Sequence, residues 1–265
     1  MKITLFTSNH RRHNYFINLL SKYCDKLFVI QESTTLFVGK NKDLYKKDAL
    51  VEKYFKKVKN AEKKIFDSKY INIKKNNISL LPIRYGDLNN MGLKYLKHFL
   101  NSDIYIIFGS SFIKGNLLRF LSKKKAVNIH MGISPFYKGA DCNFWAMYDG
   151  NFDMVGATIH RLSKKLDAGD ILFHANSEKH KNLFLYSMST VKAAFYGIIK
   201  NIIKDKDKEH IPQKQIHKKT IRITKRKDFT SKIIKEFYKK KIKFNNEKND
   251  FLLNKFILKR KDFFK

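Results

Sequence analysis

The 265-residue sequence has few of the residues that break or cross-link a chain: three prolines, two cysteines and eleven glycines. Cys24 and Cys142 lie too far apart in the sequence for a CxxC pair or a zinc knuckle, and so few cysteines fit a reducing compartment. No apolar run approaches the roughly 18 residues that a membrane-spanning helix needs. The first residues turn basic too early for a signal peptide. We therefore expect a cytoplasmic protein without membrane insertion.

Acidic residues are also scarce: 56 Lys and Arg stand against 23 Asp and Glu, which gives a formal net charge of +33. Only eight of the 56 are Arg, although Arg is the side chain that pairs in bidentate fashion with phosphate and guanine. Abundant Lys, Asn, Ile, Phe and Tyr with little Pro is a composition that A+T-rich codons produce. The charge therefore leaves open both a compositional bias and a basic surface that binds an anion or tRNA.

What the sequence does contain is enough apolar material for a core, since 43% of it is hydrophobic and 14% aromatic. Short apolar runs alternate with segments of helical periodicity, which predicts an α/β, Rossmann-like, doubly wound and mostly parallel sheet. The expected strands are residues 2–8, 26–30, 78–82, 104–108, 126–130, 155–161, 169–175 and near 221–223. The expected helices are residues 14–23, 50–66, 91–100, 116–122, 187–203 and 230 to about 240.

The composition changes after residue 204, where Lys-rich segments begin. We therefore expect a catalytic domain over residues 1–205 and a short, Lys-rich strand and helix extension over residues 206–265. The order of the last 25 residues, and the role of this tail, stay open at this point.

Several common site motifs are missing. There is no GxGxxG, no GxxxxGK[ST] and no GxSxG, so neither a dinucleotide cradle, a P-loop nor a hydrolase elbow is indicated. His10 and His13 have a spacing that could chelate a metal, but no third ligand is evident. We interpret them as part of a polar turn and expect no metal.

Polar residues at a predicted strand end are the main candidates for chemistry. Asn128 and His130 are two residues apart on a strand, so their side chains share a face, and Asp167 follows in a Leu-Asp-Ala-Gly turn. An amide can donate to an oxyanion, an imidazole can move a proton, and a carboxylate can orient the imidazole, which together suit acyl transfer. The same residues could equally cap a strand and form an Asx turn. Spacing alone leaves these two interpretations about evenly balanced.

The order of the motifs resembles the folate-dependent formyltransferase family, which includes methionyl-tRNA formyltransferase, glycinamide ribonucleotide transformylase and the sugar N-formyltransferases. The family pattern Asn-x-His-x-Ser-Leu-Leu-Pro, basic-Gly, Asp-x-Gly-(Asp/Gln)-Ile-(Leu/Ile) corresponds here to Asn128–Pro135, Lys138-Gly139 and Asp167–Leu172. The resemblance covers about residues 100–175. It departs from the pattern where Gly-Ile-Ser-Pro replaces Ser-Leu-Leu-Pro.

This resemblance implies that Asn128, His130 and Asp167 are catalytic and that N10-formyltetrahydrofolate donates the formyl group to a primary amine, without a metal. The implied folate-binding residues are Phe108, Gly109, Ser110, Phe112, Ile113, Gly132, Ile133, Ser134, Pro135, Leu166 and Gly169. The implied acceptor-binding residues are Tyr137, Lys138, Gly139 and Trp145, with core packing an equally open interpretation for Trp145.

Among acceptors, the resemblance favours a nucleotide-linked amino sugar. The turn 7–12 after the first strand has no Gly, which speaks against glycinamide ribonucleotide. The segment after residue 175 lacks the alternating strands of the barrel that methionyl-tRNA formyltransferases carry. A methionyl-tRNA formyltransferase-like activity and a non-catalytic basic binding protein on the same fold remain as alternatives. A homodimer is possible, as small sugar N-formyltransferases tend to be dimers.

Overall fold

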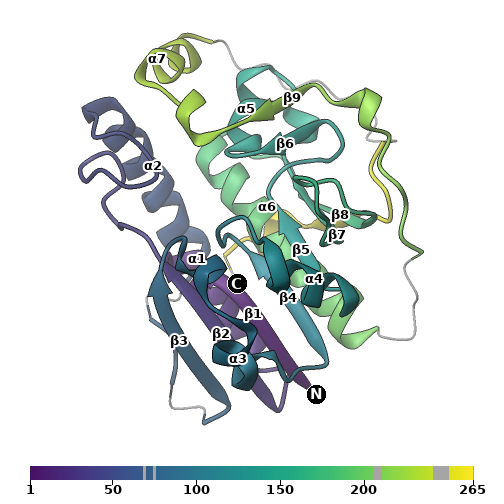
Figure 1. The fold of residues 1–265 in the computed structure, drawn as a ribbon. Coiled ribbons are helices and arrows are strands. Elements are labelled where there is room, and N and C mark those ends of the chain that lie inside the picture. Colours follow the sequence, from purple (N-terminus) through teal and green to yellow (C-terminus); the bar gives the residue numbers. More distant parts are fainter. Residues whose placement is uncertain (68–69, 74–75, 206–210, 241–250, 265) are drawn as a thin grey trace.

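A mostly parallel sheet forms the centre of the protein, as a computed structural model that describes residues 1–67, 70–73, 76–205, 211–240 and 251–264 shows (Figure 1). Within these residues the sheet has eight strands in the order β10-β8-β7-β5-β4-β1-β2-β3. Their bounds are β1 (Lys2–Ser8), β2 (Lys26–Ser33), β3 (Ile78–Arg84), β4 (Ile104–Phe108), β5 (Val127–His130), β7 (Ala157–Arg161), β8 (Ile171–Ser177) and β10 (Phe256–Leu258).

The direction in which strands are added reverses beside β1. This strand pairs in parallel with β2 on one side and with β4 on the other, while β3 and β5 extend the sheet outward in parallel. Such a reversal opens a crevice at the carboxyl ends of the two central strands, where α/β proteins bind their ligands. The expected doubly wound, mostly parallel sheet is therefore confirmed.

The strand β7 runs antiparallel to both β5 and β8. Its register with β5 places His160 opposite Asn128, and Thr158 opposite His130. Opposite residues in an antiparallel pair project to the same face of the sheet and come within reach of each other. The register thus adds a second histidine to the strand end where Asn128 and His130 lie.

Helices cover both faces of the sheet (Figure 1). Their bounds are α1 (Arg11–Leu20), α2 (Ala49–Ile65), α3 (Leu93–Leu96), α4 (Gly115–Lys123), α5 (Cys142–Tyr148), α6 (Leu183–Ile198) and α7 (Ser231–Lys239). Three of them have side-chain caps, because Asp48, Asn182 and Thr230 accept hydrogen bonds from the first turns of α2, α6 and α7. Such caps satisfy amide groups that a helix leaves without an internal partner.

The helix expected over residues 91–100 is shorter than the periodicity indicated. Only α3 is α-helical, and residues Lys97–Leu100 form a tighter 3₁₀ turn. One reason is tertiary, since Thr4 from the sheet donates a hydrogen bond to the Phe99 carbonyl at 2.6 Å. That carbonyl is thereby satisfied without the next turn of a helix.

Alternate side chains of the central strands enter different hydrophobic cores. Leu5 packs with α1 and α6 on one face, whereas Phe6 packs with Leu96 and Leu121 on the other. All four of the residues named here are fully buried. Burial on both faces explains why the central strands are continuous apolar runs rather than alternating ones.

The C-terminal segment packs against the rest of the chain. Strand β10 pairs in parallel with β8, and Phe263 is fully buried beside the Nζ of Lys192, which donates to its carbonyl at 3.1 Å. Further upstream, β9 (Arg222–Thr224) pairs in parallel with β6 (Tyr137–Gly139). Residues 251–264 are therefore ordered against the sheet, while 241–250 lie outside the described residues. The division at residue 205 stays a prediction.

Candidate active site

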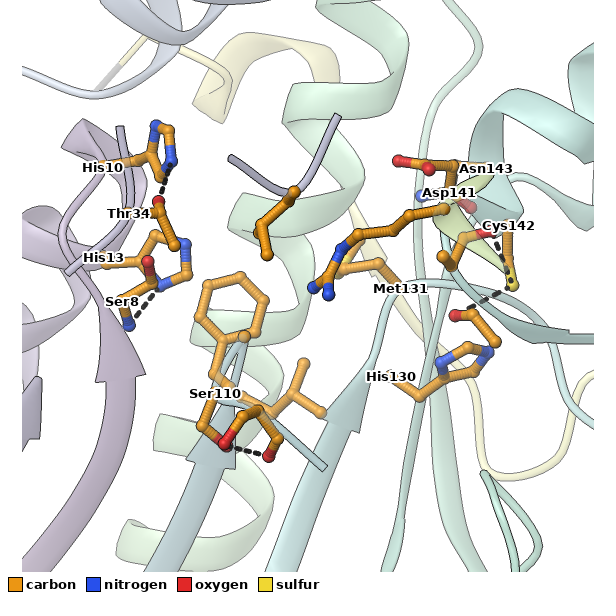
Figure 2. A pocket seen from close by; sticks show the side chains of 18 of the residues that line it. Ser8, His10, His13, Thr34, Ser110, His130, Met131, Asp141, Cys142 and Asn143 are labelled. Carbon is orange, nitrogen blue, oxygen red and sulfur yellow. Dashed lines mark hydrogen bonds between the residues drawn. The ribbon is translucent and has the colours of Figure 1, made fainter. Parts of the chain in front are cut away.

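A cavity of about 830 Å³ lies at the carboxyl ends of β1, β4 and β5 (Figure 2). The last residues of β1, β4 and β5 are Ser8, Phe108 and His130, and all three line the cavity. This is the position that the reversal in strand order predicts for a ligand crevice.

The three expected catalytic residues meet at this cavity. The Nδ1 of His130 lies 3.3 Å from Oδ2 of Asp167, although the two are 37 residues apart. Asn128 lies on the same strand as His130, and both residues line the cavity. The imidazole and the carboxylate are both nearly buried, at 5% and 9% side-chain exposure. Their attraction is therefore little screened by water.

His160 on β7 joins this group and was missed by the sequence analysis. Its Nδ1 lies 2.8 Å from the Arg161 carbonyl, and its Nε2 lies 3.0 Å from Nδ2 of Asn128. A carbonyl only accepts, so Nδ1 carries the proton and Nε2 accepts from the Asn128 amide. Burial lowers the pKa of His160 to about 4, which keeps this ring neutral and able to accept. The hydrogen bond to His160 therefore fixes the orientation of the Asn128 amide.

Backbone and side-chain groups hold the turn that carries Asp167. The Gly139 amide donates to its Oδ2 at 2.8 Å, and the Gln215 side chain donates to its carbonyl at 2.9 Å. Gly139 has a φ of 96°, and a Cβ there would come within 2.0 Å of the Thr224 carbonyl. Only glycine fits this position. The basic-Gly motif therefore serves to bring an amide to the carboxylate.

Both ring nitrogens of His130 face oxygen acceptors. Nδ1 faces Asp167, and Nε2 lies 2.9 Å from the Tyr137 carbonyl. The two contacts fix the His130 ring beside the Asn128 amide.

Roughly half of the residues expected to bind folate line the cavity. Those that do are Phe108, Gly109, Ser110, Phe112, Ile113 and Leu166. The cavity lining does not include Gly132, Ile133, Ser134, Pro135 or Gly169. Ile133 and Ser134 are fully buried, and Ser134 is bonded to Thr158 and His174 instead. The turn 132–135 therefore lies behind the cavity lining, and its part in folate binding stays a prediction.

The residues expected to bind the acceptor are mostly turned away as well. Trp145 is 3% exposed, and the Arg222 guanidinium stacks 4.8 Å from its ring. Tyr137 is also buried, with its hydroxyl 3.1 Å from Asp149, and Lys138 lies 2.9 Å from a nitrogen of His217. None of Tyr137, Lys138 and Trp145 lines the cavity, whereas Gly139 does. The aromatic pair belongs to a core shared with α2 and α7, so the packing interpretation holds for Trp145.

Polar side chains line two facing sides of the cavity. Figure 2 shows His10, His13 and Thr34 on one side and Asp141, Cys142 and Asn143 on the opposite side. His13 is buried, hydrogen-bonded to Thr7 at 2.8 Å and stacked on Phe108 at 4.6 Å. Among the described residues no cluster of three or more His, Cys, Asp or Glu could hold a metal.

The sheet, the switch point and the cavity define an α/β protein with the formyltransferase fold. Residues 98–190 match the sequence model of a family described as Formyl transferase, which confirms the resemblance drawn from Asn128, His130 and Asp167. The fold is similar to that of phosphoribosylglycinamide formyltransferase from Anaplasma phagocytophilum. That likeness has a TM-score of 0.51 at 15% identity and covers 79% of this chain and 88% of that one.

Curated relatives are similar over shorter stretches. A methionyl-tRNA formyltransferase from Thermotoga neapolitana is 36% identical over 74 residues, 28% of this chain and 23% of the relative. A GDP-perosamine N-formyltransferase from Brucella melitensis is 31% identical over 85 residues, 27% of this chain and 32% of the relative. The first curated relatives are matched over only 24% and 28% of their own length.

Across the part of the chain that the structure describes, no helix is both long enough and apolar enough to cross a bilayer.

Proposed function

We propose that this protein transfers a formyl group from N10-formyltetrahydrofolate to the primary amine of a nucleotide-linked amino sugar. The observation that carries the proposal is the meeting of Asn128, His130 and Asp167 at one cavity wall, with His130 Nδ1 3.3 Å from the carboxylate. Similarity to a GDP-perosamine N-formyltransferase supports an amino sugar as the acceptor class.

In the proposed reaction the amine nitrogen bonds to the formyl carbon, and the formyl oxygen becomes an oxyanion. Asn128 can donate to this oxyanion, because one N–H of its amide binds His160 and the other is left for the substrate. A protonated His130 adds positive charge beside it. Asp167 stabilises the charged form of His130, since burial strengthens the attraction between carboxylate and imidazolium.

Collapse of the tetrahedral intermediate breaks the bond between the formyl carbon and N10 of the folate. N10 leaves as a neutral amine after gaining a proton, and the acceptor nitrogen loses one. In this proposal a water oriented by Asp167 passes the proton from the acceptor nitrogen to N10, because both ring nitrogens of His130 face protein oxygens. The apolar lining from Phe108, Phe112, Ile113 and Leu166 suits the flat pterin ring of the donor.

A second candidate acceptor is methionyl-tRNA. It is favoured by the similarity to a methionyl-tRNA formyltransferase and by the +33 net charge, which would attract a polyanion. A non-catalytic basic binding protein is less compatible with an intact Asn128, His130 and Asp167 set.

The test is a formyl-transfer assay with N10-formyltetrahydrofolate and two acceptor pools: nucleotide-linked 4-amino-4,6-dideoxyhexoses, and bulk tRNA charged with methionine. We expect transfer to the amino sugars, and we expect His130→Ala to lower the rate by about 10²–10⁴-fold. His98→Ala, at an exposed histidine outside the cavity, is the matched control. Formylation of the tRNA pool alone would replace the sugar acceptor with methionyl-tRNA, and a His130→Ala variant as fast as wild type would refute the site.

A further inference from the structure

Two charged side chains that line the cavity have polar groups for which the described residues offer no partner. Asp141 stands at the start of α5, and Arg226 comes from the segment after β9. Both line the cavity together with His130 and Asp167. Neither belongs to the motifs that the sequence analysis assigned to chemistry.

Asp141 presents a buried oxygen without a hydrogen bond. Its Oδ1 accepts from the Tyr45 hydroxyl at 2.7 Å, whereas Oδ2 is shut off from solvent and has no partner. A buried acceptor without a partner costs free energy unless a ligand supplies the donor. Desolvation by burial raises the pKa of Asp141, so a cationic or hydroxyl donor would relieve a real cost. The residue also has a φ of 56°, an uncommon conformation for aspartate that places it at the cavity wall.

Arg226 is held in place by an aromatic ring rather than by an acid. Its guanidinium lies 5.2 Å from the centre of the Tyr85 ring, and one nitrogen donates to the Tyr85 hydroxyl at 2.7 Å. Within the described residues it forms no ion pair, whereas Arg12 in the same cavity is paired with Glu62 at 3.0 Å. A guanidinium has five N–H donors, so most of those of Arg226 are available to a ligand. An immobilised guanidinium is a good partner for phosphate.

We propose that Asp141 and Arg226 recognise the acceptor: Asp141 accepts a hydrogen bond from the amino sugar, and Arg226 binds the nucleotide's diphosphate. The inference rests on the proposed function, because it assigns two parts of the acceptor to two side chains of the same cavity. A hydroxyl or ammonium donor fits the free Oδ2 of Asp141, and an anion fits the free face of Arg226. The acceptor amine then lies between them and the His130 cluster.

The test uses a different probe for each residue: the amino sugar acceptor for Asp141 and a nucleoside diphosphate for Arg226. Asp141→Asn removes the charge but keeps an oxygen for Tyr45, and Arg226→Gln removes the cation. We expect Asp141→Asn to raise the KM for a nucleotide-linked 4-amino-4,6-dideoxyhexose by about tenfold or more. The KM for N10-formyltetrahydrofolate should change by less than about twofold. Arg226→Gln should weaken inhibition by UDP, GDP or dTDP alone by about tenfold. Asp141→Asn removes a carboxylate whose charge acts on Arg226, so it should not weaken that inhibition.

Two exposed residues outside the cavity provide matched controls, Asp87→Asn for the acid and Arg119→Gln for the base. Arg226→Lys keeps the charge and should recover part of the binding of nucleoside diphosphate. If Asp141→Asn and Arg226→Gln leave the acceptor KM and the inhibition at control values, the inference is wrong even though formyl transfer stands. If the wild type formylates no nucleotide-linked amino sugar, the proposed function fails, and calorimetric binding of the same nucleoside diphosphates still decides the role of Arg226.

Discussion

The Gln215 side chain donates a hydrogen bond to the Asp167 carbonyl at 2.9 Å and another to the Gly169 carbonyl at 2.7 Å. Gln215 lies in the C-terminal segment and is nearly buried, so this contact joins that segment to the turn that carries the Asp167 carboxylate. The Gly139 amide holds the carboxylate itself, and Gln215 holds the backbone beneath it. The position of Asp167 thus depends on residues on both sides of it in the sequence.

Loss of the Gln215 amide should loosen this turn. We expect Gln215→Ala to lower kcat about tenfold with less effect on the KM values, because two hydrogen bonds worth about 1 kcal/mol each disappear. A formyl-transfer assay measures both constants. Gln213→Ala is the control, since Gln213 is exposed and meets Ile171 only through its backbone. A Gln215→Ala enzyme with the kcat of the control would show that the turn holds its shape without this contact.

His160 is expected to act as a positioning residue through Asn128. In His160→Phe the ring stays but the acceptor for the Asn128 amide is lost, so the amide can turn away from the oxyanion. We expect kcat to fall by about 10²–10³-fold, as when one oxyanion donor is removed, while both KM values change little.

A purely structural role for His160 predicts a different pattern. His160→Gln retains an acceptor and should recover part of the lost kcat. If the Gln and Phe variants are equally slow, or if only thermal stability changes, orientation of Asn128 is not the reason for the loss.

Buried histidines should make the protein less stable in acid. His174 is 1% exposed, accepts from the Leu253 amide at 2.9 Å and faces the Ser134 carbonyl at 3.1 Å. Burial lowers its pKa to about 4, from the 6.5 of a free histidine. Between these values the unfolded chain binds a proton that the folded chain does not, so stability falls as the pH drops from about 7 to 4.

Urea unfolding at pH 7.5 and pH 5 measures this effect. His174 contributes about 2 kcal/mol between those pH values, and the buried His160 acts in the same direction. His174→Gln should reduce the difference between the two pH values, whereas His98→Gln, at an exposed position, should not. An equal difference in the His174→Gln and wild-type proteins would contradict the assignment.

Particular residues show how far the sequence alone could lead. The strand 104–108 was predicted with the bounds that the structure has, because a central parallel strand buried on both faces must be apolar throughout. Asn128, His130 and Asp167 were found because an ordered motif preserves their types and spacing. The contact between His130 and Asp167 also needs the turn between β7 and β8 to fold back toward the end of β5, where the Gly139 amide and the Gln215 side chain hold it.

His160 could not be found in the same way. It looks like one polar residue in an apolar strand, and only the antiparallel register brings it opposite Asn128. Trp145 and Tyr137 were assigned to the acceptor because aromatic rings often stack on sugars, but packing with α2 and α7 turned them into a core. The local sequence pattern does not specify whether an aromatic ring will stack on a ligand or pack into a core.

The sequence by itself determined the alternation of strands and helices from β1 to β5, the polar residues at the end of β5 and the turn that supplies Asp167, because each depends on local residue types and spacing. Tertiary structure alone decided that Gln215 supports that turn, that Asp141 keeps an oxygen without a partner, and that Arg226 reaches the same cavity. These relationships join segments tens of residues apart, and long-range packing, which no local pattern encodes, sets the distances between them.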